Sequence, residues 1–153
     1  MAGEMAPNSA LELFREEFAE ALEQSIGARE GGGDPLPGFL RLSDAFEKVA
    51  TAELAQWVNI IAELGQRVDD GLGDLAGDLG EAVSVATDAL VDASHLGLDF
   101  LSANPRIIAA GSTALAWCAL ASADADSARY VIHEHPKALT TALEILDDAT
   151  AAL

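Results

Sequence analysis

Between Leu72 and Asp99, apolar and acidic residues both recur with the period of an α-helix. The apolar residues follow one another at steps of three and four: Leu72, Ala76, Leu79, Val83, Ala86, Leu90 and Ala93. The acidic residues keep a similar rhythm half a turn away: Asp74, Asp78, Glu81, Asp88, Asp92 and Asp99. At about 100° per residue, the two sets lie on opposite sides of one helix. The sequence therefore predicts a continuous helix over 72–99, with an apolar edge to bury and an anionic stripe that faces water or a cationic partner.

The rest of the chain is also predicted to be helical, because apolar residues recur at helical spacing and no run of alternating β-branched residues is present. The expected helices cover 9–26, 43–68, 104–121, 126–134 and a segment that starts at Pro136. Asn104 is the expected N-cap of the third of these, and Ser43 of the second. The helix over 104–121 has almost no polar face and is expected at the centre. The predicted fold class is all-α, a compact bundle of five or six helices.

Residues 27–38 interrupt this helical pattern. Three consecutive glycines and two prolines disfavour regular structure there. The stretch divides the chain into an N-terminal amphipathic helix (1–26), a Gly/Pro linker (27–38) and a helical core domain (39–153). The helix begins with the capping-box pair Ser9 and Glu12, and its apolar face contains Leu11, Phe14, Phe18 and Leu22. Such a linker would let the first helix pack at a distance, swap between protomers or stay mobile.

The charge of the chain excludes several classes of partner. Twenty-six acidic against eight basic residues give a formal net charge of −18. Nucleic acids and anionic membranes are bound through clustered Lys and Arg, which this chain lacks. A basic protein partner or divalent cations remain, and adaptation to a saline cytoplasm is an equally good reason for the acidity. No signal peptide is visible, so we expect a cytoplasmic protein, and the uncharged run 107–123 is expected to be a buried helix rather than a membrane span.

Few residues have the types and spacing that catalysis or metal binding requires. Cys118 lies in the most apolar helix, where a cysteine behaves as a small hydrophobic residue, and a single cysteine forms no internal disulfide. His133 and His135 diverge if both are helical, so we expect them at a helix end rather than at a metal. His95 is expected to form a surface pair with Asp92 or Asp99. Trp57 and Trp117 are expected in the core. The sequence predicts no catalytic residue, no metal and no cofactor.

Read as one unit, residues 104–146 resemble an armadillo-type repeat. The unit begins with N-P-R-I-I, continues with the buried helix A-L-A-W-C-A-L-A, a D-A-D turn and the short helix A-R-Y-V-I-H-E, and ends with P-K-A-L-T-T-A-L-E-I-L. Armadillo units have this order of helices over about 40 residues. The glycine that precedes the third helix in the family is replaced by His135. The resemblance implies a protein-binding superhelix without chemistry, and a compact bundle with the same helix order is the open alternative.

These observations favour a non-enzymatic, acidic protein-interaction module, a scaffold or adaptor that self-associates or binds a protein partner. Two alternatives stay open: an inhibitor or immunity protein that mimics nucleic acid on a basic protein surface, and a coat or structural protein of a granule or virus particle. We expect a homo-oligomer, with no direct nucleic-acid contact and no membrane span. The predicted partner-binding residues are the acidic stripe (Asp74, Asp78, Glu81, Asp88, Asp92 and Asp99) and the N-terminal apolar face (Leu11, Phe14, Phe18 and Leu22).

Overall fold

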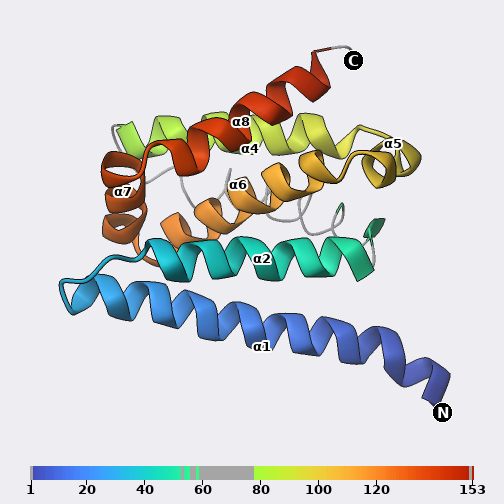
Figure 1. Ribbon diagram of the computed structural model, residues 1–153, viewed down its shortest axis with the longest axis horizontal. Coiled ribbons are helices and arrows are strands. Elements are labelled where there is room, and N and C mark those ends of the chain that lie inside the picture. The colour runs from blue at the N-terminus through green and yellow to red at the C-terminus, as the bar shows by residue number, and fades with distance from the viewer. Residues whose placement is uncertain (1, 53, 56–57, 59–77, 152) are drawn as a thin grey trace.

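The computed structural model describes residues 2–52, 54–55, 58, 78–151 and 153, without the side chains of 2–15, 49–52 and 78. All regular structure in this part of the chain is helical, which confirms the all-α prediction. The helices are α1 (Ala2–Glu30), α2 (Leu36–Ala52), α4 (Asp78–Ser94), α5 (Leu98–Ala103), α6 (Pro105–Ala123), α7 (Ala125–Glu134) and α8 (Lys137–Thr150). They form a bundle in which α1 and α2 make one antiparallel layer and α4, α6 and α8 pack beside it (Figure 1).

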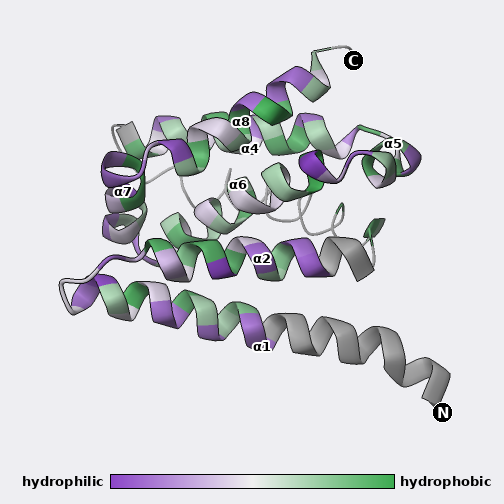
Figure 2. Cartoon of the chain, in the orientation of Figure 1, coloured by the Kyte–Doolittle hydropathy of each residue, from purple (hydrophilic) through white to green (hydrophobic). Residues whose placement is uncertain are grey.

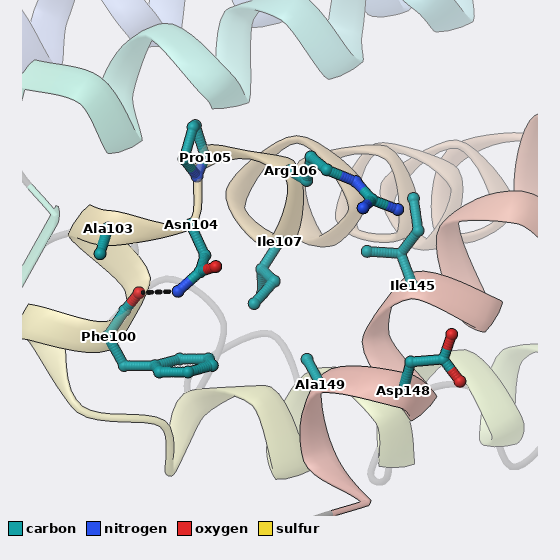
Figure 3. A pocket seen from close by; sticks show the side chains of 9 residues that line it. All are labelled: Phe100, Ala103, Asn104, Pro105, Arg106, Ile107, Ile145, Asp148 and Ala149. Carbon is teal, nitrogen blue, oxygen red and sulfur yellow. Dashed lines mark hydrogen bonds between the residues drawn. The ribbon is translucent and has the colours of Figure 1, made fainter.

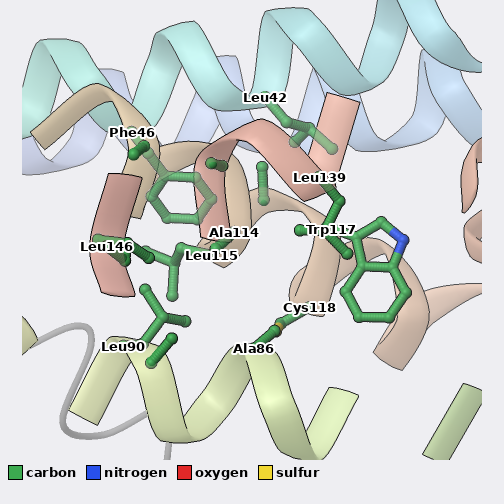
Figure 4. Packing of buried hydrophobic residues seen from close by; sticks show 14 of the residues in the cluster. Leu42, Phe46, Ala86, Leu90, Ala114, Leu115, Trp117, Cys118, Leu139 and Leu146 are labelled. Atoms are coloured by element: carbon green, nitrogen blue, oxygen red, sulfur yellow. The ribbon is translucent and has the colours of Figure 1, made fainter. Parts of the chain in front are cut away.

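The core of the bundle is built around α6, which contacts α2, α4, α7 and α8. Thirteen of its nineteen residues are buried, among them Trp117, whose side chain is fully enclosed. Ala86 and Leu90 of α4 pack on its Leu115 and Cys118 (Figure 4). The length and composition of α6 would also suit a membrane span, but 67% of that window is buried inside the fold, the pattern of a central helix. The predicted position of this helix is therefore confirmed.

The connection between the first two helices is much shorter than predicted. Helix α1 continues through Gly27 to Glu30, and α2 begins at Leu36 rather than near Ser43. The Asp34 side chain accepts a hydrogen bond of 2.9 Å from the Leu36 backbone N–H and so caps α2. Gly32 has a φ of 82°, which allows the tight turn. The predicted linker over 27–38 is thus wrong at both ends, and the connecting turn is residues 31–35.

The hairpin of α1 and α2 is held together by close backbone contact. Gly38 lies against Ser25 so closely that a Cβ on Gly38 would come within 2.7 Å of the Ser25 backbone. The Ser25 hydroxyl donates a 2.9 Å hydrogen bond to the Pro35 carbonyl. Ala21 of α1 is fully buried in the main core. The N-terminal helix therefore packs within its own chain, through its C-terminal half, and it begins at Ala2, before the Ser9 cap that we predicted.

The predicted continuous helix over 72–99 is wrong at its C-terminal end. Helix α4 stops at Ser94, where the backbone N–H groups of His95 and Leu96 bond to carbonyls three residues back. Gly97 is extended, with φ −64° and ψ 152°, and a new helix, α5, starts at Leu98. Burial of Leu96 is the physical reason, because the chain must leave the axis of α4 to bring that side chain inward. The beginning of the predicted helix, residues 72–77, lies outside the described residues.

Neither Asn104 nor Ser43 makes the side-chain cap predicted for it, whereas Asp124, which was not predicted as a cap, makes one. Asp124 caps α7, since its carboxylate accepts hydrogen bonds from the Asp126 and Ser127 backbone N–H groups. Asn104 precedes α6 but makes no side-chain cap; its amide instead donates to the Phe100 carbonyl and closes α5. Ser43 is a residue of α2 and bonds to Thr113 of α6 at 2.7 Å. The end of the predicted helix over 43–68 lies outside the described residues, as does Trp57.

Candidate functional site

The outward side of α4 carries the acidic stripe where the structure describes it. Glu81, Asp88 and Asp92 are exposed, whereas the apolar edge on the opposite side is buried: Leu79, Val83, Ala86, Leu90 and Ala93. Figure 2 shows hydrophilic and hydrophobic residues alternating along this helix. The two-sided pattern predicted for this stretch is therefore confirmed over residues 79–93.

The other predicted members of the stripe do not extend this surface. Asp99 is exposed, but it lies in the first turn of α5, so the prediction that it continues the same helix is wrong. Asp78 is the first residue of α4, and its side chain is not described; Asp74 lies outside the described residues. The described stripe on α4 thus consists of Glu81, Asp88 and Asp92.

Four exposed apolar residues on α4 and α5 were not predicted from the sequence. Val85 lies between Glu81 and Asp88 with 51% of its surface exposed, and Val91 is 38% exposed. On α5, Leu98 and Phe100 are 49% and 45% exposed. Both valines lie outside the three- and four-residue spacing of the buried edge. Apolar residues that do not fit this spacing are the feature of the sequence that could have indicated an exposed apolar surface. We call this surface the α4–α5 face and define it by Glu81, Val85, Asp88, Val91, Asp92, Leu98, Asp99 and Phe100.

The predicted apolar face of the N-terminal helix is used inside the chain where it is described. The rings of Phe18 and Phe46 of α2 meet edge to face, with centroids 5.1 Å apart. Leu22 is half-buried against the main core. The side chains of Leu11 and Phe14 are not described. Intrachain packing thus accounts for the apolar character of Phe18 and Leu22.

A groove runs between α6 and α8 on another surface of the bundle. Its first part, about 390 Å³, is lined mainly by small residues and by two cations, Arg106 and Lys137. Its second part, about 490 Å³, lies beside Phe100 and Asp148 (Figure 3). Arg106 and Ile145 line both parts, so the two hollows adjoin each other. We call the two parts together the α6–α8 groove.

Cys118 is chemically unsuited to act as a nucleophile. Its side chain is buried between α6 and α4, and burial raises the pKa of the thiol to about 12, although a hydrogen bond with Thr87 lowers it in part. A reactive cysteine needs an accessible thiolate near neutral pH. The prediction that Cys118 is a buried residue is confirmed, and it is a packing residue of the core.

The three histidines occupy separate environments. His133 is exposed in the last turn of α7, and His135 follows that helix, with its Nε2 3.1 Å from an Asp34 carboxylate oxygen. This pair connects the α1–α2 turn with the start of α8. His95 lies in the turn after α4, and within the described part of the chain no ion pair joins it to Asp92 or Asp99, so the predicted surface pair is wrong. In the same part, no three His, Cys, Asp or Glu side chains converge as metal ligands.

Comparison with known proteins adds no relative to this picture. No family model, no curated protein and no solved structure matches the chain.

Proposed function

We propose that this chain is a non-enzymatic protein-interaction module that uses the α4–α5 face as its contact surface. The observation that carries the proposal is the exposure of Val85, Val91, Leu98 and Phe100 on two consecutive helices. Leaving an aliphatic or aromatic side chain in water forgoes about 1.5–3 kcal/mol relative to burying it. A group of such side chains with polar neighbours is typical of a protein contact surface.

The charges around these residues indicate the chemistry of the partner. Glu81, Asp88 and Asp92 are exposed between and beside the valines, and no Lys or Arg lies between Val68 and Pro105. A cationic protein surface with apolar residues of its own would match both features, because opposite charges favour association and fix its register. Nucleic-acid mimicry is less well supported, since Val85 and Val91 separate the carboxylates with apolar surface that phosphate binding does not use.

The resemblance of residues 104–146 to an armadillo unit supports a function of the same kind. The segment that carries this resemblance forms α6, α7 and α8. Members of that family bind proteins, and membership of this chain stays a prediction. The cytoplasmic location and the salt adaptation suggested by the charge stay predictions as well.

A zero-length crosslinking experiment tests the proposal. A carbodiimide joins carboxylates to lysines in direct contact, so treating the protein in a lysate of its source cells and mapping the products by mass spectrometry reveals which acidic residues touch other polypeptides. We expect Glu81, Asp88 and Asp92 to be crosslinked several times more often than Glu144 and Asp147, which are also exposed, on α8. Equal yields on the two helices would show that α4 has no special contact and would refute the proposal.

A further inference from the structure

Three Lys or Arg side chains of the described residues have no carboxylate within 4.0 Å, and two of them, Arg106 and Lys137, line the α6–α8 groove. Arg41, Lys48 and Arg129 lie within 4.0 Å of carboxylates, and Arg29 stacks over the Tyr130 ring at 5.2 Å. For Arg106 and Lys137 the described part of the chain provides no carboxylate within that distance. In a chain of net charge −18, two cations without a carboxylate within 4.0 Å attract an external anion to this part of the groove, and Asp148 lines the other part.

The groove has a simple shape between these two cations. Its floor consists largely of alanines, which leave a shallow apolar hollow because their side chains end at Cβ: Ala109, Ala110, Ala138 and Ala142. Arg106 lies at the end of the hollow near Ile145, and Lys137 precedes Ile145 by eight residues on α8. At about 1.5 Å of rise per residue, the cations are therefore separated by roughly 12 Å along the groove.

The outward side of α4 has the complementary arrangement. Glu81 and Asp88 are seven residues apart, two helical turns, or roughly 10.5 Å. Val85 projects from the same side between them and is half exposed. On α4 an exposed apolar side chain thus lies between two carboxylates, and in the groove an apolar hollow lies between two cations. The distance between the two carboxylates is nearly the same as the distance between the two cations. Long, flexible Arg and Lys side chains accommodate the remaining difference.

These two surfaces cannot meet within one chain. The inner side of α4 packs on Leu115 and Cys118 of α6 (Figure 4). At 100° per residue, Arg106, Ala109 and Thr113 lie on roughly the opposite side of α6 from that contact. The groove and the outer side of α4 therefore face in different directions, and only a second molecule can join them.

We propose that the outer side of α4 in one copy of this chain docks into the α6–α8 groove of a second copy, in the part between Arg106 and Lys137. The Val85 side chain packs into the hollow lined by alanines. Glu81 and Asp88 form ion pairs with the two cations of the groove, Arg106 and Lys137. Because the two surfaces differ, the contact is heterologous and generates a head-to-tail assembly, closed or open according to its rotation. The proposal rests on the function proposed above and names its partner. At physiological ionic strength charges beyond about 8 Å are screened, so the many other carboxylates do not prevent the contact.

Charge exchange between the two surfaces tests this assembly. A groove variant carries Arg106→Glu and Lys137→Glu, and an α4 variant carries Glu81→Lys and Asp88→Lys. Sedimentation at about 0.15 M ionic strength should show that wild type self-associates and that each variant alone does so about 100-fold more weakly. An equimolar mixture of the two variants should associate again, because each altered surface then meets its complement.

A matched control separates this contact from a general effect of charge. Glu23→Lys with Glu30→Lys places the same charge changes at the same spacing on α1, where both residues are exposed, and should leave association unchanged. Circular dichroism of each variant verifies that it is folded. Wild type that stays monomeric at about 1 mM, or variants that associate as strongly as wild type or fail to recover on mixing, would overturn the assembly.

The two proposals fail in different ways. If crosslinks from Glu81 and Asp88 lead to lysines of other proteins and wild type is monomeric, the interaction module stands and the self-assembly falls. If isotope-labelled and unlabelled copies are crosslinked to each other between Asp88 and Lys137, both proposals are supported. If the carboxylates of α4 and α8 are crosslinked with equal yields, the first proposal is refuted, whatever the oligomeric state.

Discussion

Helices α6 and α4 are similar in length, 19 and 17 residues, but they differ in how much of their surface is covered by other helices. Helix α6 is enclosed by α2, α4, α7 and α8, so nearly every position in it is apolar or small. Helix α4 is enclosed on one side only, and its outer side combines carboxylates with exposed valines. Packing explains most of α6, with Arg106 in the groove as an exception, but only the inner half of α4. The outer half is therefore where function has to be sought.

Substitution of Trp117 by alanine should produce the largest effect and sharpen this contrast. Trp117 is fully buried, and its indole N–H donates to the Ala128 carbonyl at 3.3 Å, joining α6 to α7. Loss of a buried aromatic side chain costs about 3–5 kcal/mol of unfolding free energy. Urea denaturation followed by circular dichroism measures the change. Val85→Ala on the outer side of α4 is the matched control and should change stability by less than about 0.5 kcal/mol; comparable losses would mean that Val85 is part of the core.

The pH dependence of stability provides the next largest effect, at the contact between the two helices. The Cys118 pKa rises from 9.0 to about 12 on folding, so above pH 9 the unfolded chain binds fewer protons than the folded one. Stability must then fall as pH rises, by about 1.4 kcal/mol between pH 8 and pH 10. Cys118→Ala lacks the ionisable thiol and should lose that much less stability over the same interval. Parallel pH profiles for the two proteins would show that folding does not raise the pKa of the thiol.

A smaller effect is expected where α6 carries polar residues. The Thr113 hydroxyl donates to the Ala109 carbonyl at 3.0 Å, so in the 2.7 Å contact between the two hydroxyls Ser43 is the donor. Ser43→Ala removes this link between α2 and α6 but leaves Thr113 bonded to its own helix. We expect a loss of about 1 kcal/mol in urea denaturation. Thr113→Val should cost at least as much, because Ser43 is then left buried without its acceptor.

The same contrast explains how much of the structure could be predicted from sequence. Burial of α6 and of the inner edge of α4 was predictable, because a helix without a polar face must be central and a periodic apolar edge must be covered. The ends of the helices were not. Gly27 predicts the end of a helix, but α1 continues through it. The close contact of Gly38 with Ser25 and the Asp34 cap of α2 place the turn at residues 31–35 instead. The contact of Gly38 with Ser25 joins two different helices, so no local pattern indicates it.

The candidate site was predictable only in part, for a related reason. The carboxylates of α4 recur with the period of an α-helix and were predicted. Val85 and Val91 do not fit the helical spacing of the apolar residues and were not predicted. The groove depends on alanines of α6 meeting alanines of α8, which no local pattern encodes. Arg106 and Lys137 are 31 residues apart in the chain, and nothing in either neighbourhood indicates that both remain unpaired.

The smallest predicted effect compares the two ends of the α4 stripe. Glu81 lies in the first turn of α4, near the positive end of the helix dipole, and Asp92 lies in the last turn, near the negative end. Neutralising Asp92 with asparagine should therefore raise the unfolding free energy relative to neutralising Glu81 with glutamine. We expect a difference of about 0.5–1 kcal/mol at low ionic strength, which disappears at about 1 M salt. Thermal denaturation of dilute samples of the two variants, recorded at both salt concentrations, measures it.

This difference isolates the helix dipole from the general repulsion in the protein. Each substitution removes one negative charge from the same exposed side of the same helix, so relief of the repulsion due to the −18 net charge raises both stabilities alike and cancels in the comparison. Equal effects of Asp92→Asn and Glu81→Gln at low salt would mean that the dipole contributes nothing here. The carboxylates at the two ends of α4 would then have the same effect on the unfolding free energy, and a difference between them would have to come from contact with a partner.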